Sequence, residues 1–328
     1  MHSPSTPSLT ATALPAIYRR LIRPTPLVSV RVTDDQPPIA CKLDYLNPSG
    51  STKDRIAAFI LGKAFEAGRL APGDAVVEAS SGSTSIAMAM VCARLGLRFT
   101  AVMPSGVSGE RSLIIRAYGG QVVQTAADQG MIGALAQAER IANQTGAFYP
   151  RQFENPDNIE THRAGTAAEI VAQLADAGLT RIDAIVSGVG TGGTLVGLWQ
   201  GLSDRGHDVR PVVAFPVKHS AFLARCGCFG ESECCSFSCR IPGVVHRLSR
   251  LYDPAQLPRL VEIHIDDDLA IETTRRLHRL GFPVGPSSGL NYAAALQAAR
   301  QLGPDAAVLT VFPDRMERYF STELFAGC

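Results

Sequence analysis

IDAIVSGVGTGGTLVGLWQGL, residues 182–202, is the stretch that decides the fold. It opens on a short apolar run, Ile182–Val186, that is typical of a buried strand, and a helix is expected from Thr194 to about Leu202. Glycines crowd the turn between them. Glycine lets the backbone come close to a ligand, and the free N–H groups at a helix start attract phosphate. The stretch therefore predicts a strand, a turn that binds an anion, and a helix.

The same alternation of apolar runs and helical stretches continues along the chain. Such alternation predicts an α/β protein with parallel sheets covered by helices on both faces, here two α/β units with a cleft between them. Ligands of such folds bind outside the carboxyl ends of the strands. The other expected strands are Ala75–Glu78, Phe99–Met103, Gln121–Gln124, Val212–Phe215 and Ala307–Phe312, and the other expected helices are Thr84–Arg94 and Arg111–Tyr118.

Length and composition limit the class of protein. The 328 residues suffice for two domains, and 46% hydrophobic against 19% charged residues excludes wholesale disorder. A net charge of +1 without long single-sign runs argues against nucleic acid or an anionic membrane as the main partner. No apolar stretch reaches the roughly 20 residues of a membrane span. The sequence thus predicts a soluble, cytoplasmic protein.

The amino-terminal segment is rich in Ser, Thr and Pro. The first 33 residues hold four arginines and no acidic residue, a composition compatible with a transit peptide. We favour a flexible tail over residues 1–22 that leads into the fold.

The glycine turn also matches a dinucleotide-binding pattern. Gly188, Gly190 and Gly193 satisfy G-x-G-x-x-G, but a nicotinamide site needs an acidic residue about 20 positions later to hold the ribose. The sequence there is Phe215–Lys218, without an acid. A single phosphate is therefore favoured over a dinucleotide, and a nicotinamide-dependent oxidoreductase is disfavoured.

A lysine stands in the second informative motif, NPSGSTKDR at 47–55, before a helix expected from Ile56. A lysine near a helix start is unfavourable for the helix dipole, which makes Lys53 notable. A lysine together with a phosphate cradle suggests pyridoxal phosphate bound as a Schiff base.

With these motifs in order, the chain resembles the cysteine synthase / cystathionine β-synthase family of fold-type II pyridoxal-phosphate enzymes. The resemblance runs from Thr25 to about Thr322, nearly the whole chain. The motifs that carry it are NPSGSTKDR at 47–55, EASSGSTS at 78–85, QFENP at 152–156, HRAGTAAE at 162–169, GTGGT at 190–194, GPSSG at 285–289 and FPDRMERY at 312–319.

The resemblance implies a tryptophan synthase β-like fold, with the cofactor in a cleft between two doubly wound α/β domains. The smaller domain would span 45–150 and carry the loop for the substrate carboxylate. The larger domain would comprise 23–44 and 151–328. The family also implies a homodimer that acts on a small amino acid. We expect no metal site.

The resemblance also assigns roles to individual residues. Lys53 would hold pyridoxal 5'-phosphate and then remove the α-proton of the substrate, and Ser287 would hydrogen-bond the pyridine nitrogen. The phosphate would bind Gly190, Thr191, Gly192, Gly193 and Thr194. The substrate α-carboxylate would bind the loop of Ser80, Ser81, Ser83 and Thr84 together with Gln152, and Ser83 would also lie against the cofactor.

A serine at the pyridine nitrogen leaves the ring a weaker electron sink, which favours prompt loss of a β-substituent. The expected reaction is thus β-elimination or β-replacement on a serine-derived or cysteine-like amino acid. The first choice is a cysteine synthase that joins O-acetylserine or O-phosphoserine to sulfide. The alternatives are a cysteine desulfhydrase, which forms sulfide, pyruvate and ammonia, and a 2,3-diaminopropionate synthase-like enzyme.

Two departures from the family pattern bear on that choice. Synthases carry S-G-N-T-G in the carboxylate loop, whereas this chain has Ser83 in place of the asparagine. Ser83 and IPGVV at 241–245 point to the desulfhydrase branch, and the motif at 162–169 points to a synthase. Asp314 and Arg315 stand where the family often has small residues, and we expect a solvated turn there, with substrate contact as the alternative.

A third departure is the group Cys226, Cys228, Cys234, Cys235 and Cys239. Thiolates at this density could bind zinc or an iron–sulfur cluster, or sense redox state. Their spacing matches no paired C-x-x-C arrangement, so a variable loop with reduced thiols is favoured. A thiol-rich binding or sensor protein that keeps the fold is the non-enzymatic alternative.

Overall fold

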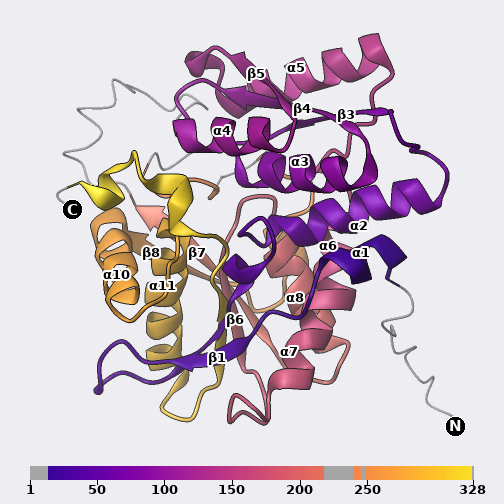
Figure 1. The fold of residues 1–328 in the computed structure, drawn as a ribbon. Coiled ribbons are helices and arrows are strands. Elements are labelled where there is room, and N and C mark those ends of the chain that lie inside the picture. The colour runs from indigo at the N-terminus through magenta and orange to yellow at the C-terminus, as the bar shows by residue number, and fades with distance from the viewer. Residues whose placement is uncertain (1–13, 218–239, 245–247, 327–328) are drawn as a thin grey trace, which may run out of the picture.

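Two separate β-sheets organise the protein (Figure 1). The computed structural model describes residues 14–217, 240–244 and 248–326. The larger sheet has the strand order β1-β2-β9-β6-β7-β8, and the smaller has the order β3-β4-β5. All described pairs are parallel except the antiparallel pair β1–β2. Two parallel α/β units were predicted, but strands β1, β2 and β8 were not among the predicted strands, and the antiparallel pairing of β1 with β2 was not expected.

The strands are β1 Leu27–Val30, β2 Ile39–Lys42, β3 Ala75–Ala79, β4 Arg98–Pro104, β5 Gln121–Thr125, β6 Ala184–Gly188, β7 Arg210–Val217, β8 Val261–Asp266 and β9 Val308–Val311. The α-helices are α1 Ala16–Leu21, α2 Lys53–Glu66, α3 Ser83–Leu95, α4 Gly109–Ala117, α5 Gly130–Thr145, α6 Asp157–Glu160, α7 Ala167–Gln173, α8 Gly193–Ser203, α10 Asp267–Arg279 and α11 Pro286–Leu302. A π-helical segment, Thr161–Thr166, joins α6 to α7.

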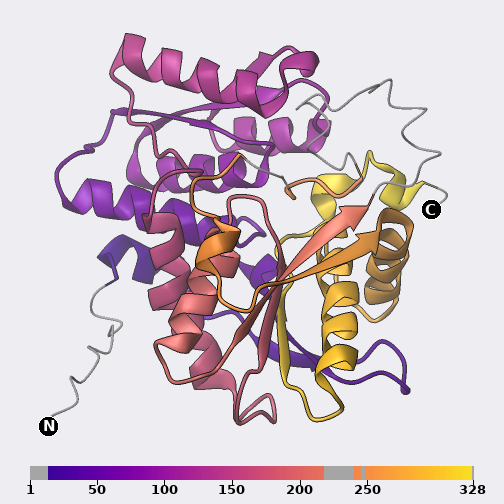
Figure 2. The ribbon, with the colours of Figure 1, turned by 180° about the vertical axis from the view of Figure 1, so that it is seen from behind.

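Helices cover both faces of the larger sheet because its strands are apolar on both sides. On β6, Ala184 and Val186 belong to the hydrophobic core shared with α10 and α11. Ile185, between them, belongs to the core shared with α7 and α8. Figures 1 and 2 show these two helix pairs on opposite sides of the sheet. The alternation follows from the two-residue period of a strand.

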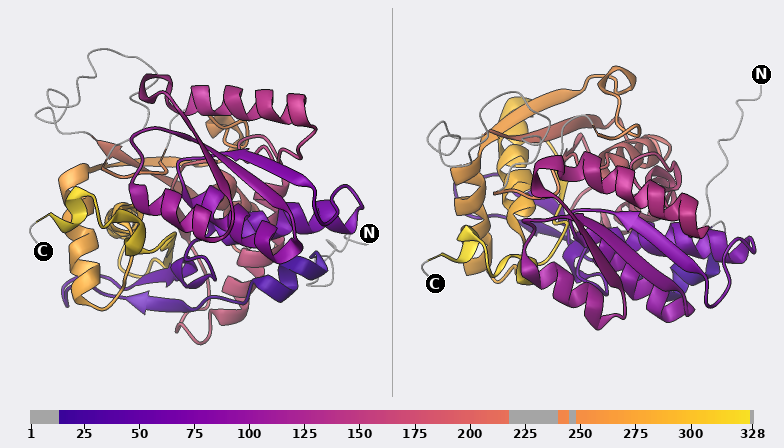
Figure 3. Two further views of the ribbon diagram at one scale, coloured as in Figure 1. Left: turned by 45° about the horizontal axis from the view of Figure 1, so that its top comes forward. Right: turned by 90° about the horizontal axis from the view of Figure 1, so that it is seen from above.

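The smaller sheet is layered in the same way. Val76 of β3 packs in a core with α2 and α3, whereas Val77 and Ala79 pack in a second core with α5. Figure 3 shows α3 and α5 on opposite faces of this sheet. The chain leaves the larger sheet after β2, builds the smaller sheet, and returns after α5. The domain limits 45–150 and 23–44 plus 151–328 stay a prediction.

Two local predictions need correction. Helix α2 begins at Lys53 rather than Ile56, because the backbone of Asp54 already donates to the Ser51 carbonyl at 3.2 Å. Within the predicted tail 1–22, Ala16–Leu21 form helix α1, and its Tyr18 is 3% exposed. The Tyr18 ring meets Phe59 of α2 edge to face with centroids 5.8 Å apart, so apolar packing ends the tail before residue 22.

The cysteine group Cys226–Cys239 lies outside the described residues. Cys41 and Cys92, which are described, are both buried free thiols. No helix in the described part of the chain is long and apolar enough to cross a membrane.

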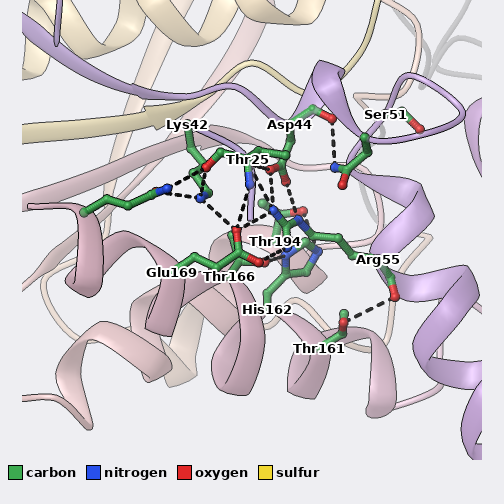
Figure 4. Close-up of polar contacts among 12 residues, drawn as sticks. Thr25, Lys42, Asp44, Ser51, Arg55, Thr161, His162, Thr166, Glu169 and Thr194 are labelled. Atoms are coloured by element: carbon green, nitrogen blue, oxygen red, sulfur yellow. Dashed lines mark hydrogen bonds and ion pairs between the residues drawn. The ribbon is translucent and has the colours of Figure 1, made fainter. Parts of the chain in front are cut away.

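A buried ion network joins the lysine helix to the larger sheet (Figure 4). Arg55 of α2 contacts Asp44 with Nη2–Oδ1 at 2.9 Å and Glu169 of α7 with Nη1–Oε1 at 2.6 Å. Lys42, at the end of β2, reaches the same Glu169 at 2.8 Å. Arg55 and Asp44 are fully buried, so each charge depends on its partner. The network fixes the helix that begins at Lys53.

Replacing Arg55 tests this network. Arg55→Met leaves Asp44 buried without its cation and is expected to lower the free energy of unfolding by about 3–5 kcal/mol in urea titrations. Burial by itself would raise the pKa of Asp44, but Arg55 outweighs it and lowers the pKa to about 2. Wild-type stability from this pair is therefore present above about pH 4 and falls toward pH 2. The variant should lack that acid-dependent loss.

The matched control is Arg276→Met. Arg276 pairs with Glu272 on the surface of α10, with its side chain 48% exposed. Its loss should cost less than about 1 kcal/mol. Equal losses in the two variants would contradict a structural role for the buried network.

Candidate active site

One cleft at the carboxyl ends of the strands collects the predicted site residues. Strands β6 and β9 of the larger sheet and β3 of the smaller one end there. All the predicted residues line it except Gly193, which is packed behind the wall. The predicted residues in the lining are Lys53, Ser80, Ser81, Ser83, Thr84, Gln152, Gly190, Thr191, Gly192, Thr194 and Ser287.

Lys53 is the first residue of α2 and is half-buried in the wall of the cleft. Burial lowers the pKa of its amine, and the carboxylates of Asp314 and Asp44 act in the opposite direction. The amine therefore loses its proton more readily than a surface lysine. A neutral amine is what a nucleophile toward a carbonyl, or a base toward a C–H bond, requires.

The glycine turn forms a close-fitting cradle before α8. A Cβ on Gly190 would come within 2.3 Å of the Gly243 carbonyl oxygen, and one on Gly193 within 2.0 Å of Asn158 Oδ1. Gly192 has φ +84°, a conformation that L side chains rarely adopt. The first N–H groups of a helix lack partners inside it, so this turn suits a phosphate group.

Two residues outside the predicted set hold the cradle. Asn158 donates to Thr191 Oγ1 at 2.9 Å and to the Gln152 carbonyl at 2.8 Å. His162 lies between Thr194 Oγ1 at 3.2 Å and Thr166 Oγ1 at 3.0 Å (Figure 4). Burial lowers the pKa of His162 to about 3, so the ring is neutral and braces the threonine without adding charge.

The serine loop between β3 and α3 is held by its own hydrogen bonds. The Ser80 hydroxyl contacts Ser85 Oγ at 2.6 Å and accepts from the N–H groups of Gly82 and Ser85, both at 3.1 Å. Gly82 has φ +143°, and a Cβ there would lie 2.1 Å from Arg111 Cδ. The loop thus keeps the start of α3 open toward the cleft. The Ser80 hydroxyl holds the conformation of the loop through these hydrogen bonds.

Thr84 and Gln152, both predicted to bind the substrate carboxylate, contact each other. Thr84 donates from Oγ1 to Gln152 Oε1 at 2.6 Å, and Gln152 Nε2 donates to the Ala79 carbonyl at 2.7 Å. Behind them the buried Glu78 carboxyl accepts from the N–H groups of Ala79 at 2.9 Å and Gln152 at 3.1 Å. Burial outweighs these donors and raises the pKa of Glu78 to about 8.

Ser287 stands in the first turn of α11 and is 9% exposed. Asn291, one turn further, ties the glycine turn to β9. Its Oδ1 accepts from the Gly188 N–H at 2.7 Å, and its Nδ2 donates to the Val311 carbonyl at 2.9 Å. The α11 start and the glycine turn are therefore held at a fixed separation.

The solvated turn predicted at Asp314 is wrong. Asp314 is only 6% exposed and lines the cleft. Its Oδ2 accepts from the Tyr319 hydroxyl at 2.7 Å and from Ser83 Oγ at 3.2 Å. Arg315 is half-exposed, with its side chain 39% accessible. The two departures from the family pattern, Ser83 and Asp314, thus touch each other across 231 positions of sequence.

Sequence reasoning missed Asn158, Asn291, Tyr319 and Arg111. The first two support backbone groups of the cleft wall, and Tyr319 stacks against Arg111, whose guanidinium carbon is 5.0 Å from the ring centroid. Tyr319 ends a motif that was recognised, and Asn158 and Asn291 each lie two residues beyond one, which was a weak signal. Arg111 lies in no recognised motif, and its partner Tyr319 is distant in sequence.

Comparisons with known proteins agree with this geometry. A model of the family described as pyridoxal-phosphate dependent enzyme matches residues 18–314. The chain is 38% identical over 311 residues to a cysteine synthase of Staphylococcus aureus, covering 94% of this chain and 96% of the relative.

Solved structures give the same picture. The structure of an O-ureido-L-serine synthase superposes with a TM-score of 0.82 at 36% identity, over 95% of both chains. A hydrogen sulfide-producing enzyme of Fusobacterium nucleatum gives a TM-score of 0.79 at 30% identity, over 92% of this chain and 98% of that one.

Adding one methyl group to the cradle should weaken cofactor binding. In Gly193→Ala the new Cβ would displace Asn158, which positions Thr191. We expect the dissociation constant for pyridoxal phosphate, from equilibrium titration of the apoprotein, to rise at least about tenfold. Gly109→Ala is the control, since nothing lies within 4 Å of that Cβ. Unchanged affinity in Gly193→Ala would contradict the cradle.

Glu78 should make stability depend on pH. The folded protein keeps the Glu78 proton up to about pH 8, whereas the unfolded chain releases it near pH 4.5. The free energy of unfolding contributed by this group therefore falls as pH rises between these values and is level above them. The difference in free energy of unfolding between wild type and Glu78→Gln, measured by urea titration, should fall by a few kcal/mol as the pH rises from about 4.5 to about 8. The exposed Glu139→Gln should show no such change; a flat difference for Glu78→Gln would contradict the raised pKa.

Proposed function

This chain belongs to the pyridoxal-phosphate-dependent enzymes and catalyses β-replacement or β-elimination on an amino acid, and within that class we propose a cysteine synthase-type reaction. A serine-derived amino acid such as O-acetylserine or O-phosphoserine would exchange its β-substituent for sulfide. The observation that carries the proposal is that Lys53, the glycine turn and the serine loop meet in one cleft.

The residues present fit the cofactor. The cradle before α8 excludes side chains and offers helix N–H groups to a phosphate, and Lys53 and Ser287 line the same cleft. We assign the phosphate to 190–194, the carbonyl carbon to Lys53 and the pyridine nitrogen to Ser287. When bound, pyridoxal phosphate supplies an electron sink for charge that develops at the substrate α-carbon.

The α-carboxylate of the substrate is assigned to the serine loop. Ser81, Ser83 and Thr84 surround the start of α3, where free N–H groups and the positive end of the helix dipole favour an anion. Ser80 keeps this loop in shape, and Gln152 holds the Thr84 hydroxyl. A substrate held by this loop would lie in the cleft that Lys53 also lines.

Lys53 would act as the base in this proposal, once the amino group of the substrate has replaced it at the cofactor carbonyl carbon. The C–H bond at the α-carbon breaks, an N–H bond forms at Lys53 Nζ, and the β-substituent leaves with its bonding electrons. Burial favours the neutral amine before this transfer. His162 stays neutral near pH 7, because burial lowers its pKa to about 3.

The cysteine desulfhydrase reaction remains the second candidate. Ser83 supports it, because this residue has a shorter reach than the asparagine of the synthase pattern and gives one donor to Asp314. The similarity to a hydrogen sulfide-producing enzyme also supports it. The 38% identity to a cysteine synthase favours the first candidate. A homodimer in the cytoplasm is part of the proposal.

Absorbance and product assays separate the candidates. Purified protein given pyridoxal phosphate should show the visible band of a lysine-bound cofactor, and Lys53→Ala should lack it. A synthase releases acetate from O-acetylserine and forms cysteine when sulfide is added. Faster release of sulfide and pyruvate from cysteine would reverse the order of the candidates, and absence of the band in wild type would overturn the site assignment.

A further inference from the structure

Lys53 lies where a positive charge is disfavoured. It is the first residue of α2, so the positive end of the helix dipole lies beside it, and it is half-buried in the wall of the cleft. A second cation, Arg111, lines the same cleft. A base that becomes an ammonium ion in this place needs a nearby negative charge.

Asp314 is brought to the lysine by the backbone. The N–H group of Thr52, next to Lys53, donates to the Pro313 carbonyl at 2.8 Å, and Ser51 forms an antiparallel bridge with Asp314. The Asp314 side chain is 6% exposed and lines the cleft that holds Lys53. Its position is therefore set by the same strand-like pairing that precedes the lysine helix.

Two hydroxyl groups fix the Asp314 carboxylate. Tyr319 and Ser83 both donate to Oδ2, at 2.7 and 3.2 Å. The other oxygen, Oδ1, is buried and accepts no hydrogen bond from the described residues. Tyr319 comes from the larger-sheet side of the cleft and Ser83 from the start of α3, so the carboxylate is held from both sides.

The other ionisable groups near Lys53 are either uncharged or already in contact with another side chain. Asp44 also acts on Lys53, but it accepts from Arg55 at 2.9 and 3.0 Å and from Thr25 at 2.8 Å. His162 is neutral, and Arg111 lies over the Tyr319 ring. Of the two carboxylates that act on Lys53, Asp44 is paired with Arg55, whereas Asp314 forms no ion pair within 4.0 Å among the described residues.

We propose that Asp314 is a positioning residue for Lys53, and that its carboxylate, held by Ser83 and Tyr319, stabilises the lysine amine in its charged form. This inference rests on the proposed role of Lys53. When the α-proton moves to Lys53 Nζ, the charge appears on an amine in the cleft that the Asp314 carboxylate also lines. The pair Ser83–Asp314, where the chain departs from the synthase pattern, thus tunes the catalytic base.

The electrostatics agree in direction. Burial lowers the pKa of Lys53, and Asp314 is the carboxylate that most strongly raises it. Removing the Asp314 charge should therefore leave more of the amine neutral at a given pH. Schiff-base formation requires the neutral amine, so cofactor uptake by the apoprotein reports this fraction without any turnover.

The experiment measures the rate of pyridoxal phosphate uptake by the apoprotein, followed by visible absorbance from about pH 6 to pH 10. Near pH 7, Asp314→Asn should take up cofactor roughly tenfold faster than wild type. The two rates should converge at high pH, where both amines are neutral. Asp314→Glu, which restores the charge, should return the profile toward wild type.

Two controls make the result decisive. Glu317→Gln removes a half-exposed negative charge from the same segment and should leave the profile unchanged. If Asp314→Asn does not fold, Asp314→Ser repeats the test with a smaller side chain. A ratio of rates that is constant across pH would indicate attraction of the anionic cofactor alone and would overturn the proposal, as would an unmoved profile.

Failure of the proposed function would look different. If Lys53→Ala still gives the visible band of wild type, Lys53 is not the attachment site and both proposals fall. If Lys53→Ala lacks the band and Asp314→Asn keeps the wild-type profile, only the role of Asp314 is lost.

Discussion

The rest of the structure depends on the ion pairs of the buried Arg55 guanidinium. The guanidinium joins the segment after β2, the lysine helix α2 and the helix α7 through Asp44 and Glu169, all away from solvent. Such a network costs much desolvation energy, so it persists only when every charge is paired. Because Arg55 belongs to α2, this pairing fixes the helix that begins at Lys53 relative to the larger sheet, and the lysine keeps one position in the cleft.

The two sheets supply different parts of the cleft. The larger sheet supplies the glycine turn and the start of α11, held together by Asn291. The smaller sheet supplies the serine loop at the start of α3. Both proposed anion sites are helix starts reached through glycines, and both are held by neutral side chains, so few charged side chains are needed in the cleft. Because charged side chains in the cleft are few, a single carboxylate, Asp314, can raise the pKa of Lys53.

Much of the fold could be predicted because its signals are local. Apolar runs, glycine turns and helical stretches occur in order along the sequence, and each predicted strand lies within three residues of an observed one. The errors arose where distant segments pack. Asp314 was expected in solvent because charged residues usually are, yet Tyr319 and Ser83 bury it. The start of the chain was expected to be a tail, yet Tyr18 packs on Phe59.

The sequence by itself determined the alternation of strands and helices, the two glycine-rich helix starts and the place of Lys53 close to a helix start, because these depend on neighbours within a few residues. Only the tertiary structure decided which side chains share the cleft and with what charge. Each of four residues has at least one partner from about 20 to more than 200 positions away: Asn158, His162, Asn291 and Asp314. The proton affinity of Lys53 depends on burial and on carboxylates that come together only when both sheets have formed.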